Sequence, residues 1–171
     1  CILDHGQIII TIPTGDHLFF CHSQMLQQAY GEFAERFEER GLSVVWEVEK
    51  EPICIMADGR QLWRILENLL GNIYKYAMQG TRVYTELYRE DRTAYLILQN
   101  TMRETLSVDA KELTGRFVRG DKSRTTEGSG LGLSIAKSLT ELHGGTLEIS
   151  IESDIFKVTV TFPVIPDEEQ E

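Results

Sequence analysis

Apolar residues recur every three to four positions in three stretches of this 171-residue chain, which is the spacing of amphipathic helices. Asp58 is the expected N-cap of the second helix, with Gln61 closing a capping box. Gly41 follows the first helix, and Gly144 and Gly145 follow the third, as glycines commonly do at helix ends. We therefore predict helices over residues 18–40, 58–78 and about 132–142.

Short apolar or alternating runs between the helices predict strands. Residues 13–16 are typical of a turn, and residues 89–92 join a hairpin. Little regular structure is expected from Asn100 to Ser129 apart from a short helix at 109–117, and such a long loop is usually a functional lid or disordered. The expected strands cover residues 7–12, 42–48, 53–56, 82–88, 94–98, 146–151 and 156–162.

The composition, 42% hydrophobic and 26% charged, is that of one soluble globular domain over residues 1–171. The net charge of −10 argues against a nucleic-acid partner, whose phosphates this surface would repel. No apolar run approaches the roughly 20 residues of a membrane span. The three cysteines lack C-x-x-C spacing, so we expect free thiols in a reducing compartment.

The two ends of the chain are less informative. The first residue is Cys and not Met, which suggests a piece of a longer protein, and residues 1–16 form a lead segment without an assigned role. Residues 164–171 are expected to be a solvated acidic tail, and residues 101–129 a lid within the single domain.

Residues 127–134 read E-G-S-G-L-G-L-S and lead directly into the third helix. Glycine lets the backbone approach a phosphate and adopt positive φ without a Cβ clash. The helix start adds free N–H groups and the positive end of the dipole, which together make a candidate anion site. A plain turn before a helix has the same glycine spacing, so the rest of the chain must decide between the two interpretations.

The polar side of the 58–78 helix carries Asn68, Asn72, Lys75 and Tyr76. Amide oxygens are neutral hard ligands that suit a Mg²⁺ ion keeping most of its waters and its phosphate oxygens. Lys75 supplies a point charge for a phosphate, and the ring of Tyr76 can stack on a base. A solvated helix face is the simpler interpretation, but together with a long lid and a glycine loop these residues favour a nucleotide site.

Three segments of the chain look like the sequence motifs of a known family and occur in the same order. Residues 58–77, D-G-R-Q-L-W-R-I-L-E-N-L-L-G-N-I-Y-K-Y-A, look like an N box; residues 117–124, F-V-R-G-D-K-S-R, look like an F box; residues 128–133 look like a second glycine box. From about residue 24 to 163 the chain resembles the catalytic and ATP-binding domain of bacterial sensor histidine kinases, in the GHKL superfamily shared with DNA gyrase and MutL. The resemblance implies a two-layer α/β (α+β) sandwich of the GHKL or Bergerat type, with about three helices on one face of a mixed sheet of about five strands.

The resemblance also implies ATP or ADP with Mg²⁺ as ligands, and transfer of the γ-phosphoryl group to a histidine. Asn68, Asn72 and Lys75 are then the catalytic residues of the N box. Asn72 is the Mg²⁺ ligand, Lys75 meets phosphate oxygens, and Tyr76 packs by the adenine.

The remaining implied contacts belong to the lid and the glycine loop. Arg119 and Arg124 are lid cations that either clamp the γ-phosphate or face solvent, and Phe117 anchors the lid on the core or is an ordinary buried side chain. Backbone N–H groups of the three glycines bind phosphates in a loop formed by Gly128, Ser129, Gly130, Leu131 and Gly132.

One segment departs from the family pattern. After the 94–98 strand the family has D-x-G-x-G, whose Asp binds the adenine amino group, whereas residues 99–106 of this chain read Q-N-T-M-R-E-T-L. Asn100 can accept the same N–H through its amide oxygen, although a neutral acceptor makes a weaker hydrogen bond than a carboxylate. Thr101 is the other candidate, and we expect adenine recognition to be weaker or differently shaped.

The family's phosphate-accepting histidine lies in an H-[DE]-x-x-[TN]-P setting, which none of the four histidines has. His22 and His143 are therefore expected to be surface or packing residues. The acceptor and dimerisation helices then belong to an upstream part of a longer protein, and this fragment is expected to be monomeric. The resemblance further implies a response regulator as downstream partner, and a cytoplasmic domain of a sensor in the bacterial inner membrane.

Two other functions stay open. The change at 99–106 would suit a regulatory or scaffold domain that binds nucleotide weakly or not at all. A GHKL ATPase, or a serine kinase of the anti-sigma type, is the third candidate. In the ATPase branches a glutamate one turn before the metal-binding Asn activates water; here that position is Asn68, and Glu67 is turned about 100° away around the helix. The F-V-R-G-D-x-S-R stretch favours the sensor-kinase branch.

Overall fold

The computed structural model describes residues 2–4, 7–9, 18–51, 53–103 and 131–165. The helices in these ranges are α1 (His22–Glu39), α2 (Gly59–Tyr76) and α4 (Gly132–Leu142). None of them is long and apolar enough to cross a membrane. The main sheet has the order β4-β6-β7-β9-β8, with strands β4 (Ser43–Val48), β6 (Arg82–Glu90), β7 (Thr93–Thr101), β9 (Ile155–Pro163) and β8 (Thr146–Glu152).

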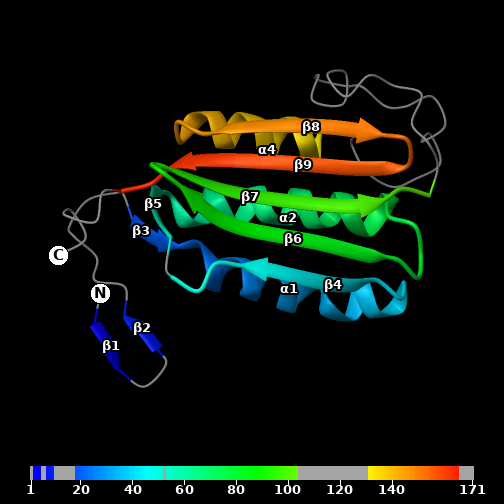
Figure 1. The fold of residues 1–171 in the computed structure, drawn as a ribbon, viewed down its shortest axis with the longest axis horizontal. Helices are drawn as coiled ribbons and strands as arrows, with labels where there is room; N and C mark the ends of the chain where they lie inside the picture. The colour runs from blue at the N-terminus through cyan, green and yellow to red at the C-terminus, as the bar shows by residue number, and fades with distance from the viewer. Residues whose placement is uncertain (1, 5–6, 10–17, 52, 104–130, 166–171) are drawn as a thin grey trace.

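The sheet is mixed and is covered on one face. β4 pairs in parallel with β6, and the other neighbours pair antiparallel. The three helices lie together behind the sheet (Figure 1). Alternation along the strands directs every second side chain into the core between the layers, as in β9 with Phe156, Val158, Val160 and Phe162. The predicted two-layer sandwich is confirmed.

The first predicted helix starts later than expected. Leu18–Cys21 is β3, which pairs antiparallel with β5 (Cys54–Ala57), and α1 begins only at His22. The prediction of a helix from residue 18 is wrong because Leu-Phe-Phe-Cys suits either structure locally, and pairing with a distant strand decides for β. Ahead of it, β1 (Ile2–Asp4) and β2 (Gln7–Ile9) form a short antiparallel hairpin.

β7 is longer than its sequence pattern predicted. Its ladder with β9 continues as far as the pair of Thr101 and Ile155, so Asn100 and Thr101 are strand residues. The expectation that irregular structure begins at Asn100 is therefore wrong. Beyond β9, Val164 bridges Ile55, and Val164 and Ile165 are both buried. The prediction of a solvated tail from residue 164 is therefore wrong for these two residues, because the packed part of the chain continues past Pro163. The predicted helix over 109–117 lies outside the described residues.

Asp58 is the N-cap of α2, as predicted. Its Oδ1 accepts hydrogen bonds from Arg60 N at 2.8 Å and Gln61 N at 3.2 Å. The capping box is wrong, because Asp58 N donates to Nε2 of His143, at 3.1 Å, and not to Gln61. Nδ1 of His143 lies 2.7 Å from Leu139 O, so the ring joins the end of α4 to the start of α2. His143 is thus a packing residue.

Candidate functional site

The predicted polar residues lie along one flank of α2. Asn68 and Asn72 are half-buried, and Lys75 and Tyr76 in the last turn are exposed. The opposite side forms the buried stripe that anchors the helix to the sheet: Leu62, Ile65, Leu66, Leu69, Leu70 and Ile73. This packing determines which way the polar flank points.

Asn68 lies against the first residue of α4. Its Nδ2 donates to Arg64 O at 2.6 Å, one turn earlier, which directs Oδ1 toward α4. A Cβ placed on Gly132 would lie 3.0 Å from that oxygen, closer than most real contacts of this kind. Any larger residue at 132 would therefore have to displace the Asn68 side chain. Residues of the predicted N box and of the predicted glycine loop meet at this point.

Asn72, one turn beyond Asn68, is the predicted Mg²⁺ ligand. Its side chain is half-buried. In the part of the chain that the structure describes, no three His, Cys, Asp or Glu residues gather as a metal cluster. A Mg²⁺ ion that brings its own waters and phosphate oxygens needs few protein ligands, so an amide oxygen at this position fits an ion carried by a nucleotide.

The C-terminal end of α2 adjoins the end of β7. Ala77 and Met102 form an antiparallel bridge, and Met78 N donates to Thr101 O at 2.8 Å. Asn100 is 3% exposed and lies on the strand face that turns toward the helices, while Thr101 lies on the opposite face. Asn100 Nδ2 donates to Thr101 O at 3.1 Å, which leaves its Oδ1 as the acceptor. The two candidates for adenine binding, Asn100 and Thr101, therefore lie on opposite faces of β7.

The start of α4 has no side-chain cap. Leu131 occupies the N-cap position with φ −92° and ψ −8°, and it has no polar group to accept from the first turn. Its carbonyl accepts from Ile135 N at 2.9 Å and from Ser134 Oγ at 2.9 Å. The N–H groups of a helix start without a cap are available to an anion.

Several predicted site residues lie outside the described part of the chain and stay predictions. They belong to the lid and to the first part of the glycine loop: Phe117, Arg119, Arg124, Gly128, Ser129 and Gly130.

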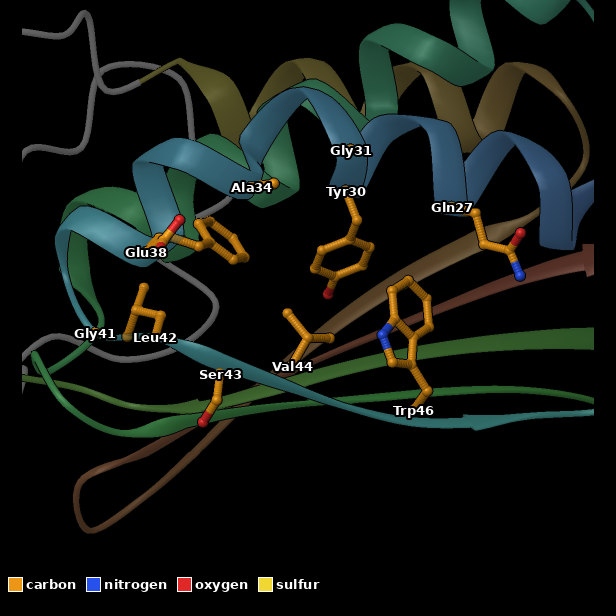
Figure 2. A pocket seen from close by; sticks show the side chains of 11 residues that line it. Gln27, Tyr30, Gly31, Ala34, Glu38, Gly41, Leu42, Ser43, Val44 and Trp46 are labelled. Atoms are coloured by element: carbon orange, nitrogen blue, oxygen red, sulfur yellow. The ribbon is translucent and has the colours of Figure 1, made fainter.

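A groove that is separate from the predicted site lies beside α1. This open groove of about 760 Å³ runs between α1 and β4, with Trp46 and Tyr30 pointing into it (Figure 2). The Tyr30 hydroxyl and Thr85 Oγ1 are 2.5 Å apart, and burial raises the pKa of Tyr30 above its ordinary value. None of the predicted site residues lines this groove.

Two side-chain contacts at the ends of α2 were not predicted from the sequence. His143 joins α4 to the first turn of α2, and Arg40 donates to backbone carbonyls in the last turn of α2. Both contacts link positions far apart in the chain, and neither has a local sequence signal.

The chain matches a family of known proteins. The family model for "Histidine kinase-, DNA gyrase B-, and HSP90-like ATPase" matches residues 57–166. The probable sensor protein PcoS of Escherichia coli is 35% identical over 147 residues, which cover 80% of this chain and 30% of PcoS. The sensor histidine kinase WalK of Bacillus subtilis is 28% identical over 153 residues, 86% of this chain and 23% of WalK. The chain therefore spans under a third of the length of these relatives.

Solved structures agree in fold. The mycobacterial sensor histidine kinase MprB superposes with a TM-score of 0.73 at 23% identity, covering 88% of this chain and 99% of that one. The catalytic domain of the histidine kinase ThkA gives a TM-score of 0.76 at 18% identity, covering 89% and 100%. The chain belongs to the family of histidine kinase-, DNA gyrase B- and HSP90-like ATPases, and the relatives it resembles include a probable sensor protein and a sensor histidine kinase.

Proposed function

We propose that this chain is the ATP-binding catalytic domain of a sensor histidine kinase, which transfers the γ-phosphoryl group of Mg·ATP to a histidine on another domain of the parent protein. The observation that carries the proposal is the meeting of the α2 polar flank with the uncapped glycine start of α4, at Asn68 and Gly132. The family match and the names of the relatives support it.

The proposed chemistry needs positioning and charge neutralisation and no nucleophile from this chain. Bound Mg²⁺ would neutralise charge on the phosphates. Asn72 would hold the ion through its amide oxygen, and Lys75 would meet the phosphates as a point charge. The N–H groups at the start of α4 would bind phosphate oxygens, as helix N-termini do.

At the other end of the ligand, Asn100 would accept a hydrogen bond from the adenine amino group. Its burial on the helix-facing side of β7 and its remaining acceptor atom support Asn100 over Thr101. Tyr76, exposed beside this strand end, would pack against the base.

Transfer to histidine suits the N box better than hydrolysis does. The position one turn before Asn72 holds Asn68, whose Oδ1 faces Gly132, and an amide cannot act as a general base for water. Glu67 is exposed and lies one residue away from that position on the helix. The acceptor histidine would come from a dimerisation domain outside this sequence.

The wider assembly is also part of the proposal. The parent protein would be a sensor in the bacterial inner membrane, this domain would lie in the cytoplasm, and a response regulator would receive the phosphoryl group. The domain by itself would be monomeric, because dimerisation belongs to the other domain.

The test is calorimetric titration of this chain with ADP, with and without Mg²⁺. Asn72→Ala is expected to remove the Mg²⁺-dependent part of the affinity, because it deletes the proposed metal ligand. Gln28→Ala, which deletes an exposed amide on α1, is the matched control and should bind like the wild type. No binding by the wild type at millimolar ADP would overturn the proposal and support a scaffold role, with residues 99–106 as the first place to look for the cause.

A further inference from the structure

Arg40 makes an unusual set of contacts just beyond the end of α1. Its two terminal nitrogens donate to backbone carbonyls of another helix, Nη1 to Tyr74 O and Nη2 to Ala77 O, the second at 2.9 Å. The guanidinium carbon also lies 5.5 Å from the centroid of the Tyr74 ring, which is cation–π range. The Arg40 side chain thus holds the last turn of α2 through two hydrogen bonds to carbonyls and one cation–π contact.

These carbonyls are groups that a helix cannot satisfy by itself. The last four C=O groups of an α-helix lack intrahelical partners and form the negative end of its dipole, where a cation is favourable. The planar guanidinium can reach two acceptors at once, which an ammonium group does less well. Partial burial and the nearby charge of Arg103 lower the pKa of Arg40 from its ordinary value.

Arg40 is itself firmly placed. Its carbonyl accepts from Gly80 N at 3.0 Å, and the following Gly41 has φ +61°, a conformation that favours glycine. A Cβ on Gly41 would also lie 3.4 Å from Gly80 Cα, so the α1 end and the 78–81 turn touch through their backbones. A side chain that starts from so restrained a backbone can hold its target in place.

The turn that Arg40 grips is the one that carries the exposed side chains of the site. Lys75 and Tyr76 lie between the two carbonyls, and Asn72 is one turn earlier. Arg103, two residues after the end of β7, holds the same turn by donating from its backbone N to Tyr76 O at 3.1 Å. Helix ends fray where such contacts are missing, because the last carbonyls then bond to water.

We infer that Arg40 is a positioning residue for the nucleotide site: it holds the last turn of α2 so that Lys75 and Tyr76 keep their binding geometry. The inference rests on the proposed function and deepens it, since Arg40 itself touches no ligand. Without Arg40 only part of the population would keep the binding-competent turn, and the apparent affinity falls in proportion to that fraction.

The experiment compares three variants of this chain by ADP titration with Mg²⁺, at a temperature where circular dichroism shows each one folded. Arg40→Met keeps the apolar stem and removes every donor, and we expect ADP binding to weaken about tenfold. Arg40→Lys keeps the charge but not the two-pronged geometry, and should recover part of that loss. Arg36→Met is the matched control: Arg36 lies in the last turn of α1, with its guanidinium carbon 5.2 Å from the Phe33 ring centroid, and the variant should bind like the wild type.

Hydrogen exchange supplies a readout at the turn itself. The amides of Ala77 and Met78, which donate to Ile73 O and Thr101 O, should exchange faster in Arg40→Met than in Arg36→Met. If Arg40→Met lowers the melting temperature but binds ADP as tightly as the wild type, Arg40 is structural only and the inference is overturned, while the proposed function stands. If the wild type itself does not bind ADP, the proposed function fails, and the inference fails with it.

Discussion

α2 and α4 lie side by side and antiparallel, yet they begin in opposite ways. Asp58 caps α2 with two backbone hydrogen bonds, and its own N–H is taken by His143 from the end of α4. α4 begins at Gly132, and its N-cap residue Leu131 offers no side-chain cap. The two starts have the same dipole, but among the described residues only the start of α2 has a side-chain cap.

The difference separates structural from functional helix ends. A side-chain cap stabilises a helix by roughly 1 kcal/mol, so a start without one gives up stability. An anion at such a start can supply the missing acceptors. The capped start of α2 is therefore expected to matter for folding alone, and the open start of α4 for nucleotide binding.

The largest effect is expected from Gly132→Val. The new side chain would push against Asn68 Oδ1, which already lies 3.0 Å from the Cβ position, and would move the start of α4 away from α2. ADP affinity should fall by tenfold or more, about 1.4 kcal/mol, in calorimetry. Gly31→Ala is the control, since nothing lies within 4 Å of a Cβ there; it should leave affinity unchanged and stabilise α1 by up to about 1 kcal/mol. Wild-type affinity in Gly132→Val would contradict the placement of the site.

Leu131→Asp should weaken ADP binding less, by about fivefold, because it places a negative charge beside the proposed phosphate position. Leu131→Asn has nearly the same shape without the charge and should lose less affinity. Added salt should reduce the difference in ADP affinity between the two variants, because screening weakens the repulsion between the Asp carboxylate and the phosphates. Equal affinities at low salt would mean that no phosphate approaches the start of α4.

Asp58→Ala should act on stability alone. Loss of the cap removes the acceptor for Arg60 N and Gln61 N, and should lower the free energy of unfolding by about 1 kcal/mol in urea titration. Asp58→Ser keeps a cap and should recover most of the loss. ADP affinity should stay unchanged in both variants. If Asp58→Ala also lost ADP affinity, the start of α2 would matter for binding as well as for folding, and the distinction between the two helix starts would be wrong.

The smallest effect is expected from Gln61→Met at the capped start. Gln61 Oε1 is buried and has no hydrogen-bond partner among the described residues. An apolar side chain of similar length removes this unsatisfied acceptor and should raise the free energy of unfolding by about 0.5 kcal/mol. Gln28→Met, at an exposed position on α1, is the control and should be close to neutral. A loss of stability in Gln61→Met would show that the amide is satisfied in solution.

The sequence alone determined what depends on neighbours along the chain. The α2 and α4 helices follow from a 3.6-residue apolar period, and Asp58 was identified as a cap because its hydrogen bonds reach only two and three residues ahead. The N-box, F-box and glycine-box motifs led to the family, which the family model confirms over residues 57–166.

Only the tertiary structure decided features that join distant segments. Leu18–Cys21 became a strand through β5, and β7 gained Asn100 and Thr101 through its ladder with β9. His143 replaced Gln61 at the start of α2 across 85 positions, and Arg40 reached the end of α2 across 34 and 37. Local periodicity reports which face of an element is apolar, but the partner of a polar group depends on how the elements pack, and packing is a property of the whole chain.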